Sequence, residues 1–261
     1  MTSPPTATAG AAPGIGEYRF RIDGTVAVLK LHYEPRPRGA VLVLHGLGAS
    51  AQEQRPELVS IAGAGLAAVA LDAPHHGSRR DGWLDQMAAA RPPESHIMLL
   101  RLIREALPEV RRAIDHLSAE GHGPVGIVGI SMGAYIALAA ATEDDRIRAT
   151  VSILGSPDWS PRTGPIPTEM RALMAYAPVE RPADLARHPL LLCNAGRDEH
   201  VPARFARDFS RRVAASYPAL GPQVHYVEYA ESGHFMRPED WQDVWARTLA
   251  FLRAHLLAFL G

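Results

Sequence analysis

Short apolar runs that alternate with helical segments are the feature that most constrains the fold of this chain. The runs are AVLVLHG (40–46), LAAVALD (66–72), PVGIVGI (124–130), IRATVSIL (147–154), PLLLCNA (189–195) and QVHYVEY (223–229). They have strand length, and several are nearly continuous in apolar residues, which is typical of strands buried on both faces. Helical patterns lie between them at 51–64, after 130 and near 202–216. This alternation predicts an α/β fold with a mostly parallel central sheet, helices on both faces, and a ligand site beyond the carboxyl ends of the strands.

The two ends of the chain depart from this pattern. Residues 17–34 hold two alternating segments around Asp23–Gly24, a dipeptide that favours a tight turn, so we expect an antiparallel N-terminal hairpin. Residues 238–260 begin with proline and acids and keep helical spacing, which predicts a closing helix. Residues 1–16 are rich in Pro, Ala, Thr and Gly and are expected to form a flexible tail. We expect residues 17–261 to form a single domain.

Composition argues against several classes of function. Lys plus Arg number 27 against 28 Asp plus Glu, so no overall charge favours nucleic acid or an anionic membrane. The single cysteine, Cys193, rules out an intramolecular disulfide and argues against a thiolate metal site. No signal-peptide pattern or run of about 20 apolar residues occurs. We therefore expect a soluble, cytoplasmic protein, monomeric or homodimeric, that acts on a small molecule.

The segment GISMG is the strongest catalytic candidate. It fits the pattern G-x-S-x-G and lies after a buried strand and before a helix, where this motif presents a nucleophilic serine on a strained turn. Such a turn requires neighbours without side chains, and Gly129 and Gly133 meet this requirement. The alternative is that Ser131 only caps the following helix. Because serine alone is a poor nucleophile, the catalytic interpretation requires a base and an acid elsewhere.

Two later strand ends supply these partners. Asp198 and His234 each follow a predicted strand, so both are expected at the sheet edge that carries Ser131. The chain order Ser, Asp, His is the order expected for this architecture. In these roles His234 takes and returns the serine proton, while Asp198 orients the imidazole and stabilises its charged form. Two alternatives stay open: the adjacent Glu199 is a rival acid, and Asp198 could pair with a neighbouring arginine instead.

The turn LHGLGAS (44–50) is a candidate oxyanion site. Acyl transfer needs donors aimed at the developing negative charge, and backbone N–H groups in a glycine-rich turn provide them without rearrangement. The N–H groups of Leu47 and Met132 are the predicted pair. His45 is expected to brace this turn by hydrogen bonds rather than to touch substrate.

Two long connections, 73–96 and 155–182, are predicted to roof a substrate pocket, the second as a small lid that is either mobile or fixed. The candidate pocket walls are apolar side chains in or beside the strand-end loops: Trp83, Met87, Trp159, Met170, Met174, Tyr176 and Phe235. Such a pocket favours an acyl chain or an aromatic group. The alternative for each residue is ordinary core packing.

A catalytic metal is not expected. His75 and His76 are adjacent and cannot easily face one ion from a strand-end loop, and no second cluster completes a site with Asp72. Asp72 is expected to tie down its own loop.

The chain resembles the α/β-hydrolase family over about residues 17–261, because it carries four motifs in the order typical of that family: LHGLG, GISMG, GRDEHVP and ESGHF. The LDAPHHGSR segment is most similar to the esterase and dipeptidyl-peptidase-like branch of the family. The resemblance implies the α/β-hydrolase fold and a Ser-His-Asp hydrolase without a cofactor. We expect a carboxylesterase that cleaves small to medium esters through an acyl-serine intermediate. A peptidase or acylaminoacyl-type amide hydrolase and an acyl thioesterase would use the same residues. A catalytically silent binding scaffold is the alternative from another class.

Overall fold

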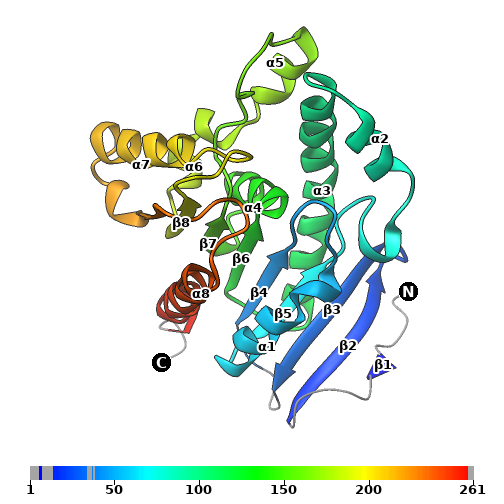
Figure 1. Cartoon of the computed structure of the whole chain (residues 1–261). Coiled ribbons are helices and arrows are strands. Elements are labelled where there is room, and N and C mark those ends of the chain that lie inside the picture. Colours follow the sequence, from blue (N-terminus) through cyan, green and yellow to red (C-terminus); the bar gives the residue numbers. More distant parts are fainter. Residues whose placement is uncertain (1–5, 8–13, 34–36, 38, 258–261) are drawn as a thin grey trace.

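The computed structural model describes residues 6–7, 14–33, 37 and 39–257, which form a central sheet with helices on both sides (Figure 1). The strands are β1 (Thr6–Ala7), β2 (Ile15–Ile22), β3 (Val26–Tyr33), β4 (Ala40–Leu44), β5 (Ala67–Leu71), β6 (Val125–Ile130), β7 (Ile147–Ile153), β8 (Leu190–Ala195) and β9 (Val224–Tyr229). The helices are α1 (Arg55–Gly63), α2 (Trp83–Ala89), α3 (Glu94–Ala119), α4 (Met132–Glu143), α5 (Thr168–Met174), α6 (Pro182–Leu185), α7 (Arg204–Ser216) and α8 (Pro238–Leu252).

The sheet is parallel except at its N-terminal side. Its strand order is β1-β2-β3-β5-β4-β6-β7-β8-β9. Strands β1, β2, β3 and β5 pair antiparallel, whereas every pair from β5 through β9 is parallel. The hairpin turns at Asp23, whose φ is 50°, and Gly24, whose φ is 72°, as the Asp-Gly dipeptide predicts. The predicted fold class is confirmed.

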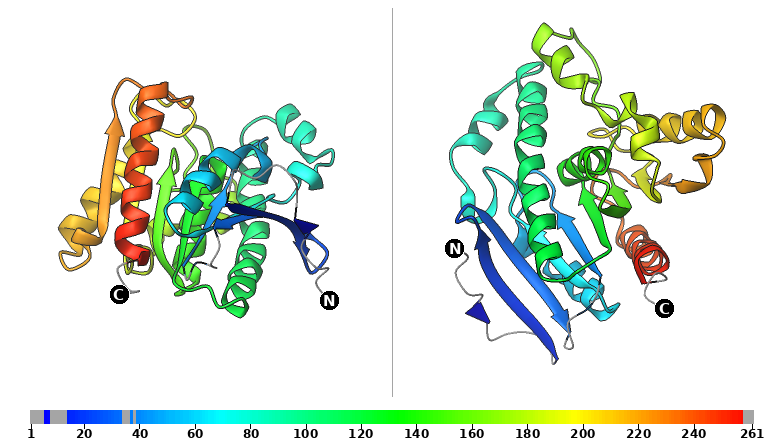
Figure 2. Two further views of the ribbon diagram at one scale, coloured as in Figure 1. Left: turned by 90° about the horizontal axis from the view of Figure 1, so that it is seen from below. Right: turned by 180° about the vertical axis from the view of Figure 1, so that it is seen from behind.

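Each face of the sheet carries its own core. In β4 all five residues are buried, and Leu42 packs with α3 and α4 while the neighbouring Val43 packs with α1 and α8. This division follows from the alternation of side chains along a strand, and it explains why the apolar run is continuous. Figure 2 shows α3 and α8 on opposite sides of the sheet.

The chain ends at the expected helix, with one difference. Helix α8 starts at Pro238 and has Glu239 and Asp240 in its first turn, which suits the fixed φ of proline and the positive end of the helix dipole. It ends at Leu252 and passes into a π-helical turn at Arg253–Leu257, whereas the prediction extended the helix to residue 260. Residues 258–260 lie outside the described residues.

The tail predicted for residues 1–16 is wrong at two places. Thr6–Ala7 forms a short strand against β2, and Ile15 and Gly16 already belong to β2. Ile15 pairs with Tyr33 and is only 5 % exposed, so burial at the sheet end draws the strand further toward the N-terminus than composition suggests. The other residues of the predicted tail, 1–5 and 8–13, are outside the described part. Among the helices in the described ranges, none has the length and apolarity that a bilayer crossing requires.

Candidate active site

Ser131 stands on a strained turn between β6 and α4. Its φ of 52° and ψ of −115° lie outside the regions that non-glycine residues favour. The flanking glycines are required by close packing: a Cβ on Gly133 would lie 2.1 Å from the Leu44 carbonyl oxygen, and one on Gly129 would lie 2.2 Å from the Gly133 carbonyl oxygen. The side chain of Ser131 makes no capping hydrogen bond to α4, so the alternative that Ser131 only caps this helix does not describe it.

The structure brings Ser131, His234 and Asp198 into one chain of hydrogen bonds. Ser131 Oγ lies 3.0 Å from His234 Nε2, and His234 Nδ1 lies 2.7 Å from Asp198 Oδ2. The loops after β6, β8 and β9 therefore meet at one edge of the sheet, as their positions after strands predict. With Nδ1 donating to the carboxylate, Nε2 is left free to accept the serine proton.

Asp198 is held on both of its oxygens. Oδ1 accepts hydrogen bonds from the N–H groups of His200, at 2.8 Å, and Val201, at 2.9 Å, while Oδ2 faces His234. Burial disfavours the charged carboxylate, but the hydrogen bond from His234 and those two N–H groups outweigh it and hold the pKa of Asp198 below its usual value. The rival acid Glu199 is exposed, and the nearby Arg197 pairs with Glu231 rather than with Asp198.

The two predicted oxyanion donors lie beside this serine. Leu47 and Met132 both line the cavity that contains Ser131. The N–H of Met132, the first residue of α4, precedes the first hydrogen bonds of the helix, which Ala134 and Tyr135 donate to the Ser131 carbonyl. The N–H of Leu47 donates to no other backbone carbonyl in the described part of the chain.

His45 joins the loops after β4 and β5. Its Nε2 accepts the N–H of Ala73 at 3.0 Å, so the ring proton is on Nδ1, which donates to the Gly46 carbonyl at 2.8 Å. Burial lowers the pKa of His45, which favours this neutral form. In a trans peptide the C=O and the next N–H point in opposite directions, so the bond to Gly46 also orients the N–H of Leu47. His45 braces the turn as predicted.

A cavity of about 870 Å³ opens around Ser131 and His234. One wall comes from α1 and the start of α8 and includes Gln54, Glu57 and Trp241. Another part of the wall comes from α2, the start of α3 and the connection after β7, and includes Met87 and Arg162.

Comparison with known proteins identifies the family. Residues 41–244, most of the chain, match the model of the alpha/beta hydrolase family. The chain belongs to this family. The hydrolase is 29% identical over 182 residues to Esterase YjfP of Escherichia coli (strain K12), a match that covers 64% of this chain and 71% of that protein.

Two solved structures share the fold of this hydrolase. TT1662 from Thermus thermophilus superposes with a TM-score of 0.74 and 24% identity, over 92% of this chain and 97% of the other. The acylaminoacyl peptidase of Pyrococcus horikoshii superposes with a TM-score of 0.70 and 18% identity, over 92% of this chain and 41% of the peptidase. At these identities the likeness concerns the fold alone.

Several predicted pocket walls do not line the cavity of the hydrolase. Trp159 and Met170 are 0% exposed and belong to the core. Trp83 and Met174 pack against that core from its surface, and Tyr176 is exposed beneath Arg104. Trp159 and Met170 turn away because burial in the core removes more apolar surface from water than a position at an open pocket does.

Met87 and Phe235 do line the cavity, as predicted. Phe235 is 91% exposed beside His234, at the mouth of the cavity. Other lining residues were missed, among them Gln54, Glu57, Tyr135 and Trp241. Gln54 and Glu57 carry a signal that the sequence contains: two polar residues at helical spacing directly after the oxyanion turn.

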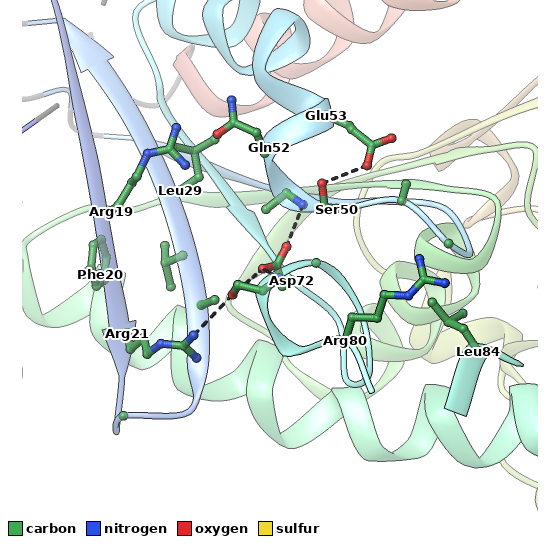
Figure 3. Close-up of a pocket in the computed structure, with 18 residues that line it drawn as sticks. Arg19, Phe20, Arg21, Leu29, Ser50, Gln52, Glu53, Asp72, Arg80 and Leu84 are labelled. Atoms are coloured by element: carbon green, nitrogen blue, oxygen red, sulfur yellow. Dashed lines mark hydrogen bonds between the residues drawn. The ribbon is translucent and has the colours of Figure 1, made fainter. Parts of the chain in front are cut away.

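A second cavity, of about 800 Å³, lies next to Asp72 and has neither Ser131 nor His234 in its wall. Figure 3 shows Asp72 between Arg21 and Arg80. The Asp72 carboxylate accepts the N–H of Ala51 at 2.8 Å and the N–H and hydroxyl of Ser78, each at 2.9 Å, so it ties down its loop as predicted.

The two adjacent histidines turn to different partners. His75 bonds to Asp81 at 2.7 Å, whereas the buried His76 donates to the Pro74 carbonyl at 2.7 Å.

Proposed function

We propose that this hydrolase cleaves small to medium carboxylic esters through an acyl-serine intermediate. The observation that carries the proposal is the hydrogen-bonded series Ser131, His234 and Asp198 at the wall of a large cavity. Nucleophile, base and orienting acid are thereby within reach of one another and of a bound substrate.

The reaction follows from these contacts. His234 Nε2 takes the proton of Ser131 as Oγ attacks the ester carbonyl carbon, and the oxygen that becomes negative lies toward the N–H groups of Leu47 and Met132. Collapse of the tetrahedral intermediate breaks the carbon–oxygen bond to the alcohol, which leaves with the proton from His234. Water, deprotonated by the same nitrogen, then attacks the acyl carbon. The bond from that carbon to Ser131 Oγ breaks, Oγ takes the proton back from His234, and the acid leaves.

The depressed pKa of Asp198 supports its role. A carboxylate that stays ionised across the neutral range stabilises the imidazolium that His234 becomes when it takes the serine proton. Asp198 acts through His234 and does not touch the substrate.

The size and walls of the cavity support small to medium esters. Its volume of about 870 Å³ is within the usual range of ligand pockets, about 300 to 1,000 Å³. Met87, Leu99 and Phe235 supply apolar surface for an acyl chain or an alcohol group. The esterase name of YjfP agrees with an ester substrate.

An amide or thioester substrate is the second candidate, since the same residues would act on it. The fold shared with the acylaminoacyl peptidase fits this alternative. Comparison of kcat/KM for matched p-nitrophenyl esters, aminoacyl p-nitroanilides and acyl thioesters would rank the classes. We expect the esters to be cleaved fastest.

The test of the nucleophile uses p-nitrophenyl acetate and butyrate with Ser131→Ala. We expect kcat to fall by about 10⁶-fold, because the nucleophile itself is lost. Ser95→Ala, a change in the wall of the same cavity, is the matched control and should keep its activity and its labelling by a fluorophosphonate probe. Turnover that persists in Ser131→Ala would overturn the assignment. A wild-type protein that neither labels nor turns over any ester would favour the binding scaffold.

A further inference from the structure

One wall of the active-site cavity contains two polar side chains that have no role in the proposed reaction. Gln54 directly precedes α1 and is 9% exposed, and Glu57 lies in the first turn of that helix and is half-buried. Both line the cavity that contains Ser131. Residues three apart on a helix are neighbours on one face, so the two side chains form a single patch.

Both side chains carry an acceptor without a donor. Gln54 Oε1 and Glu57 Oε2 are shielded from solvent and accept no hydrogen bond from any residue that the structure describes. Several buried polar atoms elsewhere also lack partners, but among the described residues only these two belong to the wall of this cavity. Other acids nearby are satisfied: Ser50 donates to Glu53 at 2.9 Å, and Ala51 donates to Asp72 at 2.8 Å.

The patch also lacks a cation. No described Lys, Arg or His forms an ion pair with Glu57, and this holds for the arginine in the cavity wall, Arg162, which comes from the connection after β7. Burial raises the pKa of Glu57, and hydrogen bonds from its own backbone N–H and from Trp241 oppose this shift only in part. The carboxylate thus gives up part of its hydration without a protein cation in return.

We propose that Gln54 Oε1 and the Glu57 carboxylate form a subsite for a protonated amine of the substrate. An ammonium group brings three N–H donors and one positive charge, so one group supplies what both acceptors lack. The inference rests on the proposed esterase function and narrows its substrates to esters that carry a primary amine, such as amino-acid esters.

The test compares esters that differ only in having an ammonium group where the partner has a methyl group of similar size. On the acyl side these are methyl 3-aminopropanoate against methyl butanoate, and methyl 4-aminobutanoate against methyl pentanoate. On the alcohol side the pair is 3-aminopropyl acetate against butyl acetate. The kcat/KM of each ester is measured by acid release at neutral pH with wild type, Glu57→Gln, Gln54→Leu and Glu53→Gln.

We expect wild type to favour the ammonium member of at least one pair by about 10-fold or more, as a charge-assisted hydrogen bond supplies. Glu57→Gln should reduce this preference to about 1, with the neutral ester hydrolysed within about 2-fold of wild type. Gln54→Leu should reduce it in part and gives an independent test if Glu57→Gln folds poorly. Glu53→Gln, on the same segment but outside this cavity, should keep it.

Two outcomes would overturn the subsite. One is hydrolysis of the neutral esters by wild type with no preference in any pair, which leaves the esterase proposal intact. The other is a preference that survives both Glu57→Gln and Gln54→Leu. Hydrolysis of neither member of any pair, together with no labelling of Ser131 by a fluorophosphonate, would overturn the proposed function itself.

Discussion

The edge of the sheet below the cavity and the roof above it are held by different interactions. At the edge, hydrogen bonds fix each side chain: Asp198 accepts three, and His45 joins two loops. In the roof, Trp159 and Met170 are fully buried in the core beneath the connection after β7. The edge therefore sets the positions of a few reacting atoms, whereas burial fixes where the roof lies.

This difference predicts that substitutions in the two regions change different quantities. A change at the edge should reduce turnover by orders of magnitude and cost only the modest stability that its hydrogen bonds contribute. A change at the buried side chains of the roof should reduce the free energy of unfolding first.

The largest effect is expected for Asp198→Asn at the edge. Asparagine can still accept the N–H groups of His200 and Val201 through its carbonyl oxygen, so the fold should persist. Its amide cannot hold His234 with a proton on Nδ1, so kcat for p-nitrophenyl butyrate should fall by about 10⁴-fold. The matched control is Glu199→Gln, which should stay within about 2-fold of wild type, because Glu199 lies outside this cavity.

The pH dependence of the free energy of unfolding gives a second measurement on the pair Asp198 and His234. The folded pKa of Asp198 is depressed, so its contribution to stability is present above its unfolded pKa, about 4, and is lost as the pH falls through the folded pKa. Asp198→Asn should remove this part of the acid-side loss of stability. Retained activity in Asp198→Asn together with loss in Glu199→Gln would assign the acid to Glu199 and break the comparison.

The same difference explains how much could be predicted from the sequence. Ser131, Asp198 and His234 each follow a short apolar strand, and parallel strands bring their carboxyl ends to one edge, so the strand pattern and the motifs together place these side chains. The oxyanion turn follows in the same way. The fold was predictable for this reason, because the strands β4, β5, β6 and β8 are nearly continuous apolar runs.

The cavity walls were not predictable by this logic. Trp159 and Phe235 are both aromatic residues in strand-end loops, yet one is 0% exposed and the other 91% exposed. Which of them enters the core depends on how a long connection folds back over the sheet, and apolar character alone does not encode that path. The polar spacing of Gln54 and Glu57 is visible in the sequence, but the cavity that they line is formed by several distant segments and exists only once the fold is assembled.

The second prediction concerns the roof. Trp159→Ala should lower the free energy of unfolding by about 3 to 5 kcal/mol, since a large side chain leaves a fully buried site. Trp83→Ala is the control, because Trp83 is only half-buried and stacks on His75, and we expect a loss below about 2 kcal/mol. Urea unfolding of both variants measures the difference.

This experiment also separates a fixed wall from a mobile lid at residues 155–182. A fixed wall that shares the core should make Trp159→Ala costly in stability. If the free energy of unfolding hardly changes while KM for p-nitrophenyl butyrate rises, the segment moves independently of the core and the contrast between edge and roof is wrong.

The smallest effect is expected in the rate at which a thiol reagent labels Cys193. This rate sharpens the comparison between edge and roof because it reports opening of the sheet. Cys193 lies in β8, is 0% exposed, and burial raises the pKa of its thiol to about 12. At mildly alkaline pH the folded protein therefore holds almost no thiolate, and a disulfide reagent such as DTNB should react only when the core opens. Asp198→Asn should leave the labelling rate within about 2-fold of wild type, because it acts on the edge. Trp159→Ala should accelerate labelling by a factor that follows its loss of unfolding free energy, since the same core must open in both measurements. Equal labelling rates in the two variants would show that burial in the roof does not support the sheet.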